Sequence, residues 1–506
     1  MNRIVSVPRV VIEADGVPLP PTDVRGLEEL RVQQRLSLPT LFELVFRDRL
    51  ATLTQVPALA PGARLRAEVN GQKEPLFVGE VTAIEHVYGP AHGREVRIRG
   101  YDLLHRLRKR QTLRAYVQVT VLDLVRELVG GLGISVQASD PGPLWQRLIQ
   151  HRPSDFDLLV EVAERCGLYF YLHGDDLHLL TLDGAGETVS LVLGQSLLEA
   201  RIEVNGDPAC RSAEVNGWDP LRVETHGGRA LSARVGRDIA AEVPPARLGG
   251  DGKRVLMNQT VQDERQAAAL AQAELDVCVA REVSLWGVAE GDARLRPGIP
   301  VQVTGVGDSL EGRYVLTGVT HTIDERMGFV SEISTCPAVP QPRATSTVAT
   351  FGVVTRVDDP DKIGRIKVSL PTYGDVETEW MEVASPGAGH GKGLVTLPDV
   401  GDRVLVLFAN GDPGQGIVLG GLYGVGGPPD SGVEGGAVRR YTFLTPGGQR
   451  IRLDDAQHVV HVENSQGSYV ELSPERVSVH AVVDLQLEAP GKAVVIRGKS
   501  IDFVRA

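Results

Sequence analysis

Few residues in this sequence have the types and spacing that catalysis requires. The tetrapeptide Gly307-Asp308-Ser309-Leu310 spells the nucleophile block of a lipase family, in which a serine attacks an ester carbonyl. It falls in a turn between two predicted strands, and no helix follows it. The pattern therefore favours an ordinary turn.

A glycine-rich stretch and two acidic pairs suggest other chemistry. Residues 387–393 (GAGHGKG) hint at a phosphate loop, but Pro386 replaces its first glycine and Gly393 replaces the serine or threonine that would hold Mg²⁺. Asp358-Asp359 and Asp454-Asp455 lie at turns, and adjacent strand residues point to opposite faces, so neither pair suits a glycosidase. We predict a barrel loop, turn-capping acids, no catalytic residue and no cofactor.

One histidine could bind a metal in an assembly of three chains. His458 shares its parity with Val460 and Val462, so three copies could turn their imidazoles toward a common axis. It also stands at a strand start beside a turn, which favours an exposed histidine. We therefore predict no metal site, with His458 as the one weak candidate. His480 has the opposite parity to its neighbouring valines and is expected to face solvent.

The C-terminal segment, residues 439–506, has the strongest pattern in the chain. Apolar residues come in pairs around one intervening residue, and each pair is bounded by turn-forming residues. The pairs are Ile451/Leu453, Val460/Val462, Val470/Leu472, Val477/Val479, Leu485/Leu487, Val494/Ile496 and Ile501/Phe503. One chain cannot bury such short strands, whereas three chains around one axis would leave no free edge. We predict an intertwined trimeric β-helix or β-prism needle.

Two sets of needle residues follow from this pattern. The predicted trimer axis is lined by Val460, Val462, Val470, Leu472, Val477, Val479, Leu485 and Leu487. Beyond them, three blunt chain ends would expose apolar groups and strand edges. We predict that a small separate tip protein seats there, on Lys499, Ile501, Phe503 and Ala506.

Composition limits the classes of protein. With 57 glycines, 31 prolines and 5% aromatic residues, the 506-residue chain suits several mainly β domains. A net charge of −12 argues against a general nucleic-acid binder, so the eight cations from Arg94 to Arg114 are assigned to a subunit interface. No signal peptide or apolar run of membrane-spanning length occurs, which predicts assembly in the cytoplasm. The four cysteines are expected to be buried thiols: Cys166, Cys210, Cys278 and Cys336.

The chain divides into seven parts by its strand, helix and linker patterns. They are a first barrel (1–116), a helical and hairpin insertion (117–189), a second barrel (190–336), a linker (337–349), an OB-fold barrel (350–424), a second linker (425–438) and the needle (439–506). VRIRGYDL (96–103) and EVNGWDPL (214–221) form a faint internal repeat, consistent with two related barrels. The predicted fold class is therefore mainly β and multidomain.

Local signals set several elements. Thr120 and Asp123 form a capping box for a helix over 121–128, and Ser154 and Asp157 form another for the helix that Gly167 ends. Hairpins are predicted over 168–181 and over 300–321, and a third helix over about 263–279. The OB-type unit is expected to have strands over 352–357, 364–370, 380–383, 393–397, 402–408 and 416–422.

Two groups of motifs carry a family resemblance. The first group is Gly352-Val353-Val354, Asp358-Asp359-Pro360, Gly364-Arg365-Ile366, Trp380, LPDVGD (397–402), Gly411-Asp412-Pro413 and VLGGLY (418–423). In this order they resemble the OB domain of the valine-glycine repeat spike proteins of type VI secretion and of the baseplate spike of contractile-tailed phages. Residues 152–171 resemble the hub motif shared with phage late-control proteins. Further residues resemble the end of the second hub barrel of these proteins: Arg296-Pro297-Gly298 and Gly312-Arg313-Tyr314, with Val319 and His321.

The resemblance implies a function. It implies a homotrimer whose two hub barrels per chain form a pseudo-six-fold ring, which adapts a hexameric inner tube to the needle. Baseplate proteins, a small PAAR-like tip protein and effector cargo are the implied partners. The leading hypothesis is a spike that pierces a target envelope mechanically. The alternatives are an envelope-degrading enzyme such as a peptidoglycan hydrolase, a glycan-binding spike component, and a passive trimeric adhesin.

Overall fold

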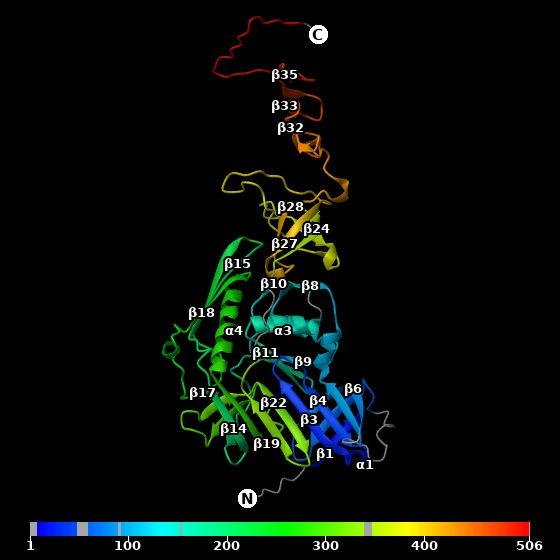
Figure 1. Cartoon of the computed structure of the whole chain (residues 1–506), viewed down its shortest axis with the longest axis vertical. Helices are drawn as coiled ribbons and strands as arrows, with labels where there is room; N and C mark the ends of the chain where they lie inside the picture. Colours follow the sequence, from blue (N-terminus) through cyan, green and yellow to red (C-terminus); the bar gives the residue numbers. More distant parts are fainter. Residues whose placement is uncertain (1–7, 48–58, 90–92, 152–153, 339–346, 505–506) are drawn as a thin grey trace. The chain divides into compact units, whose positions relative to one another are not determined.

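The computed structural model describes residues 8–47, 59–89, 93–151, 154–338 and 347–504 (Figure 1). The chain forms two compact units, Met1–Gly421 and Leu422–Ala506. Strands predominate in both units, so the predicted mainly β class is confirmed. Within the described residues, no helix is both long enough and apolar enough to cross a membrane.

The first unit contains one sheet of eleven strands. In spatial order these are β14 (Leu197–Val204), β19 (Val283–Glu290), β23 (Gly328–Ser334), β22 (Gly318–Asp324), β3 (Leu27–Arg35), β4 (Leu41–Arg47), β7 (Gly93–Tyr101), β6 (Phe77–Gly89), β5 (Arg64–Val69), β1 (Val10–Ala14) and β2 (Val17–Pro18). β22 pairs antiparallel with β3, and His321 lies opposite Val32. The two halves that the sequence pattern separates, 1–116 and 190–336, therefore share one continuous sheet.

Two hydrophobic cores lie along this shared sheet. Alternate residues of β4, Phe42, Leu44 and Phe46, are buried in the first core, as the period of a half-buried strand requires. The short helix α1 (Pro21–Val24) lies between β2 and β3 in the chain. Leu285 and Tyr314 are buried in the second core, under the strands of the C-terminal half.

A smaller sheet corrects one sequence prediction. Its order is β13 (Val189–Val192), β20 (Pro300–Thr304), β21 (Gly312–Val315) and β17 (Asp238–Ile239). The hairpin of β20 and β21 forms as expected, but its second strand does not continue to His321. Leu316 is fully buried and hydrogen-bonds Gly298 and Ile299 through its backbone, after which the chain enters β22 of the large sheet. A burial pattern alone cannot show that a strand changes sheets.

The third predicted helix packs on a sheet of three strands. α4 (Glu264–Glu282), capped by Asp263, lies against β16 (Glu224–Ala230), β15 (Ser212–Asp219) and β18 (Lys253–Thr260). The approach is close, because a Cβ on Gly228 would lie 2.2 Å from the carbonyl carbon of Ala267. A 3-10 turn, η4 (Pro245–Leu248), precedes β18.

The insertion follows the local sequence signals closely. Its elements are β8 (Arg114–Val119), α2 (Val121–Leu128), β9 (Ser135–Ala138), β10 (Trp145–Gln150), α3 (Asp155–Arg165), β11 (Tyr169–His173) and β12 (Asp176–Leu180). The preceding turn η3 (Leu103–Lys109) and the first residues of β8 lie before the predicted start of the insertion at residue 117. The capping box of Thr120 and Asp123 is present, and the Ser154 side chain accepts from the N–H of Asp157. Arg152 and Pro153, at the start of the hub-like motif, lie outside the described residues.

The OB-type unit is a sheet in the order β26 (Val376–Glu377), β25 (Lys367–Leu370), β24 (Val348–Arg356), β27 (Arg403–Phe408) and β28 (Gly416–Gly421). The short turns η5 (Pro371–Tyr373) and η6 (Ala409–Gly411) connect its strands. Residues 380–383 contribute isolated bridges rather than a strand. The strand predicted over 393–397 is wrong for the single chain, because these residues are exposed and pair with no described strand.

The second unit is an antiparallel meander. After η7 (Gly424–Gly426), β29 (Val433–Glu434) and β30 (Ala437–Val438), the strands β31 (Arg440–Leu444), β32 (Arg450–Asp454), β33 (Val459–Glu463), β34 (Tyr469–Leu472) and β35 (Val477–His480) pair in chain order. The strand pairs predicted after residue 484 are wrong for the single chain, since residues 481–504 form no strand. Short strands with one apolar side need a partner edge, and one described chain offers none there.

Candidate assembly surfaces of the needle and the hub

One face of the β31–β35 sheet carries two columns of apolar side chains. Cross-strand register aligns one column through Phe443, Ile451, Val462, Val470 and Val479. The second column runs through Tyr441, Leu453, Val460, Leu472 and Val477. Directly opposite side chains are the pairs that stabilise a sheet, so each column is continuous from strand to strand.

These columns are open to solvent in the single chain. Val460 is half-buried, the exposure of the other column residues ranges from 42% at Val470 to 68% at Val477, and a cavity of about 550 Å³ lies over the face. Six of the eight predicted axis residues, those from Val460 to Val479, lie on this face. Leu485 and Leu487 follow the last strand and are 58% and 68% exposed. An apolar surface of this extent marks an interaction site, and its closure around an axis stays a prediction.

The opposite face of the same sheet is polar and carries an imidazole that the sequence patterns did not single out. Nδ1 of His461 lies 3.1 Å from a carboxylate oxygen of Glu471, and Nε2 lies 3.1 Å from one of Glu463. The His461 ring stacks on Tyr469 at 5.1 Å, and Tyr469 stacks on His480 at 5.0 Å. Strand parity would have placed His461 on this face, but its carboxylate partner on β34 depends on register.

The two histidines that the sequence did single out lie elsewhere. His458 is exposed in the turn before β33 and has a left-handed backbone conformation, with φ of 55°. His480 is on the polar face, as its parity predicts. Among the described residues of one chain, no group of three histidine, cysteine or acidic side chains could hold a metal ion.

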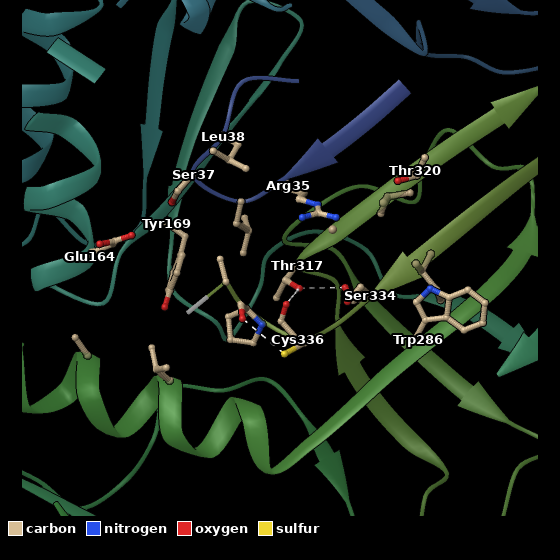
Figure 2. A pocket seen from close by; sticks show the side chains of 18 of the residues that line it. Arg35, Ser37, Leu38, Glu164, Tyr169, Trp286, Thr317, Thr320, Ser334 and Cys336 are labelled. Atoms are coloured by element: carbon tan, nitrogen blue, oxygen red, sulfur yellow. Dashed lines mark hydrogen bonds between the residues drawn. The ribbon is translucent and has the colours of Figure 1, made fainter. Parts of the chain in front are cut away.

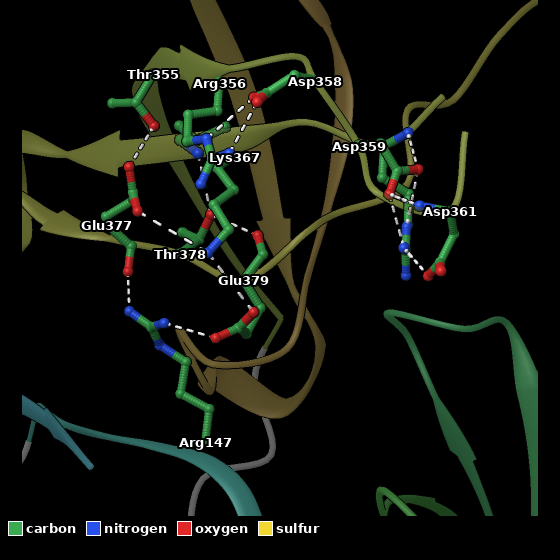
Figure 3. A network of polar contacts seen from close by, with 12 residues as sticks. Arg147, Thr355, Arg356, Asp358, Asp359, Asp361, Lys367, Glu377, Thr378 and Glu379 are labelled. Atoms are coloured by element: carbon green, nitrogen blue, oxygen red, sulfur yellow. Dashed lines mark hydrogen bonds and ion pairs between the residues drawn. The ribbon is translucent and has the colours of Figure 1, made fainter. Parts of the chain in front are cut away.

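The OB-type barrel is bound to the insertion by an arginine (Figure 3). Arg147 on β10 is 11% exposed; its Nη1 donates to a carboxylate oxygen of Glu379 at 2.7 Å, and its Nη2 donates to the carbonyl of Glu377. The same acids lie within 4.0 Å of Lys367. A planar guanidinium suits this forked contact, which fixes both direction and position.

A second set of polar contacts closes this junction from the α4 side. Nε2 of Gln262 donates to the carbonyl of Arg147 at 3.1 Å, and the backbone N–H of Gln146 donates to the Gln262 amide oxygen at 2.8 Å. The three-stranded sheet reaches the barrel through Asn410, whose amide lies 3.5 Å from the carbonyl of Asn258. The barrel is therefore held by contacts from two separate elements.

One acid of each pair predicted to cap turns does so. Asp359 is buried and accepts from the backbone N–H groups of Asp361, Ile363 and Arg365 and from the Arg365 guanidinium (Figure 3). These bonds, the Arg365 guanidinium foremost, hold the pKa of Asp359 far below its usual range. Asp454 is also buried, and it accepts from the N–H of Gln457 at 3.0 Å. Both acids organise turns.

The two motifs that resemble catalytic sequences lie in connecting segments. Gly307 to Leu310 form the turn between β20 and β21, and the Leu310 carbonyl accepts from the Tyr314 hydroxyl at 2.7 Å. The stretch 387–393 is an exposed loop in which Lys392 donates its backbone N–H to Gly389 at 3.2 Å. Neither segment gathers a nucleophile, base and oxyanion donor.

A cavity of about 380 Å³ lies where the large sheet meets α3 and α4 (Figure 2). At its rim the Thr317 hydroxyl donates to the carbonyl of Cys336 at 2.8 Å, and the Trp286 indole donates to Glu332 at 2.9 Å. Cys336 is exposed here, so its predicted burial is wrong; the other three cysteines are buried and free, as predicted. The cavity is framed by bonds that fix the end of the second barrel.

Several of the cations between residues 94 and 114 pair with acids of their own chain. Arg97 pairs with Glu95, Arg106 with Glu80, and Arg114 with Glu127. Arginines of this stretch also lie over aromatic rings, for example Arg108 over Phe156 and Arg114 over Tyr116. Such pairing lowers the charge available to a phosphate backbone.

His321 shows what the resemblance motifs do in this fold. Its Nε2 donates to the carbonyl of Leu295 at 3.0 Å, and its Nδ1 accepts from the Ser331 hydroxyl at 2.9 Å. Burial lowers the pKa of His321 to about 4, so the imidazole is neutral near pH 7. The histidine ties β22 and β23 to the segment that contains Arg296 and Gly298.

Comparisons with known proteins agree with this architecture. A family model described as the type VI secretion system/phage-baseplate injector OB domain matches residues 350–423, the β24–β28 barrel. A second model, described as the Alg8 N-terminal domain, matches residues 48–325, more than half of the chain. The type VI secretion system spike protein VgrG1a of Pseudomonas aeruginosa is 23% identical over 514 residues, which cover 90% of this chain and 77% of that protein.

Two solved structures share the fold at low identity. The Escherichia coli c3393 protein, described as a type VI secretion component similar to the T4 tail proteins gp27 and gp5, has a TM-score of 0.52 at 13% identity and covers 81% of this chain and 99% of its own. A chain of the Francisella PdpA-VgrG complex has a TM-score of 0.53 at 8% identity and covers 95% and 89%. The chain therefore belongs, through residues 48–325, to the family described as the Alg8 N-terminal domain, and over most of its length it is similar to VgrG spike proteins of type VI secretion systems.

Proposed function

We propose that three copies of this chain form the spike and hub of a contractile injection particle. The hub adapts a hexameric inner tube to a three-fold needle, and the needle pierces the target envelope mechanically, without catalysis by this chain. The observation that carries the proposal is the pair of exposed apolar columns on one face of β31–β35. Three such faces turned toward one axis would bury these columns.

The hub and the collar supply the rest of the machine. The shared eleven-stranded sheet gives a rigid base for contacts with the tube and the baseplate proteins, and the Arg147 contacts bind the OB collar to that base. The particle assembles in the cytoplasm, and the spike leaves the cell when the particle is released or fires. Effector cargo travels with the spike or its tip.

The end of the needle receives a small PAAR-like tip protein. Ile501 and Phe503 are 50% and 93% exposed and extend beyond the last strand of the single chain, beside Lys499. Ala506, the fourth residue of the predicted tip interface, lies outside the described residues. Exposed apolar groups beyond the last strand are the kind of surface that a partner protein covers.

The tip interface is tested by deletion of residues 499–506. Binding of the purified tip protein is expected to be lost in a pull-down, while light scattering still gives the mass of a trimer. Retained tip binding would place the interface elsewhere. A peptidoglycan-release assay on the intact trimer tests the enzymatic alternative, and turnover above that of a buffer control would contradict a purely mechanical role.

A further inference from the structure

The segment from Gly393 to Leu397 (GLVTL) has the composition of a strand and no strand partner among the described residues of its own chain. Leu394, Val395 and Leu397 are 49%, 83% and 42% exposed, whereas such side chains are normally buried in a barrel. The N–H of Leu394 donates to the carbonyl of Pro386 at 3.1 Å. For residues 395–397, no backbone hydrogen bond to another described residue is present.

This segment lies beside a rigid turn. A Cβ built on Gly364 would lie 3.7 Å from Cδ1 of Leu397, so the segment ends against the turn that Asp359 holds with three backbone bonds. Ile363 in that turn is 61% exposed, and Val400 after the segment is 58% exposed. The barrel thus presents an ordered edge with apolar side chains and unused backbone donors and acceptors, which together are a template for strand pairing.

We propose that residues 393–397 form a β-strand between protomers, added to an edge of the OB sheet of a second copy of this chain. This inference rests on the proposed trimer. The strands at the two edges of that sheet are β26 and β28; Val418 on β28 already bridges Val383, so a strand added to β28 would pair beyond this bridge. Pairing would satisfy the backbone of residues 395–397 and bury the three apolar side chains.

A second copy is the expected partner because of covalent linkage. Each barrel continues along its own chain into a needle segment, so three needles joined at one axis hold three barrels together. Such tethering produces effective concentrations in roughly the millimolar range, at which one short strand pairs even though it is too weak to do so alone. A separate baseplate or cargo protein would have to compete with this local concentration.

The test measures hydrogen exchange on the purified full-length protein. Slow exchange at residues 395–397 in the trimer is expected, together with faster exchange there in Thr396→Pro, which removes one N–H and disfavours pairing. His390→Pro is the matched control in the same loop. His390 is the second residue of a turn closed by the Lys392 to Gly389 bond at 3.2 Å, with Gly391 at φ of 67°, and proline fits that position.

Four outcomes test this inference and separate it from the proposed function. The intermolecular strand is supported if exchange at residues 395–397 is slow in the trimer, becomes at least tenfold faster in Thr396→Pro and is unchanged in His390→Pro. A trimer in which residues 395–397 exchange at the rate of an unstructured peptide overturns the strand and leaves the spike proposal intact. A protein that light scattering finds monomeric overturns both. Protection that appears only after a baseplate protein is added also overturns it, because the partner is then not a second copy.

Discussion

At the scale of single residues, His321 is expected to set part of the acid sensitivity of the hub. Its folded pKa is about 4, against 6.5 for the unperturbed group. Because the folded pKa is the lower one, the unfolded chain takes up a proton first as the pH falls. The free energy of unfolding contributed by His321 is therefore complete above pH 6.5 and is lost as the pH drops toward 4, by about 3 kcal/mol in total.

Urea unfolding at about pH 7 and about pH 5 tests this assignment. His321→Gln keeps a donor near the Leu295 carbonyl and removes the titration, so its stability is expected to change less with pH than that of the wild-type protein. The exposed His390→Gln serves as control and should keep the wild-type slope. Equal slopes in His321→Gln and the wild-type protein would show that other groups dominate.

Residue roles could be predicted where the partner is close in sequence. Thr120, Ser154 and Asp359 bind backbone groups within six positions of themselves, so their cap and turn roles can be recognised from spacing alone. Arg147 and Glu379 are 232 positions apart, and nothing in either local sequence indicates the pair. His461 is intermediate between these cases. Strand parity predicts which face of the sheet carries it, but only the strand register shows that Glu471 is its partner.

The faint repeat also has a physical basis at this scale. Asp102 and Asp219 are both buried, and each accepts from the backbone N–H two positions later, at 3.0 Å and 2.8 Å. Gly100 and Gly217, two positions before these acids, both face a neighbouring carbonyl so closely that a Cβ would clash. The shared letters therefore reflect a shared local structure, although the two strands belong to different sheets.

At the scale of elements, the needle face gives a sharp prediction. Val479→Asp would place three carboxylates at the proposed axis. Burying each unpaired charge costs roughly several kcal/mol, so the substitution is expected to prevent trimer formation. Ser478→Asp, one position earlier on the opposite face, is the matched control and should still give a trimer. Size-exclusion chromatography with light scattering reports both. A trimeric Val479→Asp would contradict the proposed axis.

The junction of hub and collar gives another prediction at this scale. Arg147→Ala removes charge-assisted bonds to Glu379 and to the Glu377 carbonyl and is expected to destabilise the docked barrel by about 2 kcal/mol. Hydrogen exchange in β26 and thermal unfolding measure the effect. Arg294→Ala, whose side chain is 71% exposed, is the control and should change stability by less than about 0.5 kcal/mol. Equal effects would remove any special role for Arg147.

Elements were predictable when the chain itself completes them. Capped helices and tight hairpins, such as α2 and the β11–β12 pair, form close to their predicted bounds. Residues 393–397 and those after residue 484 have strand composition and form no strand in one chain. Composition shows which segments are able to form a strand, but a strand also needs a neighbour to pair with, and composition does not identify that neighbour.

At the scale of the whole molecule, light scattering of the purified protein is expected to give three times the 54.5 kDa of one chain. The reason is that one chain leaves both apolar columns of the needle sheet exposed. Dilution should not dissociate the trimer readily, because three intertwined chains cannot separate without losing strand pairing. A stable monomer with a folded C-terminal sheet would contradict the spike proposal.

The linkers and motifs predict an order of domains, but they do not show how residues 1–116 and 190–336 join. The β3–β22 pairing links residues about 290 positions apart in the sequence. Long-range pairing of this kind leaves no local sequence pattern. The sequence pattern therefore predicts two separate barrels in the hub. Only the structure shows that they share one sheet.

That union limits how the protein can be divided. Seven residue pairs join β3 to β22, from Arg35 opposite Gly318 to Glu29 opposite Asp324. A protein engineer who expresses either half alone would expose the unpaired edge of a long strand, which invites aggregation. The two halves of the hub are therefore expected to be inherited together. Recombination that exchanges the needle or the collar can yield a working chain, whereas a crossover inside the hub must preserve both strands of the β3–β22 pairing.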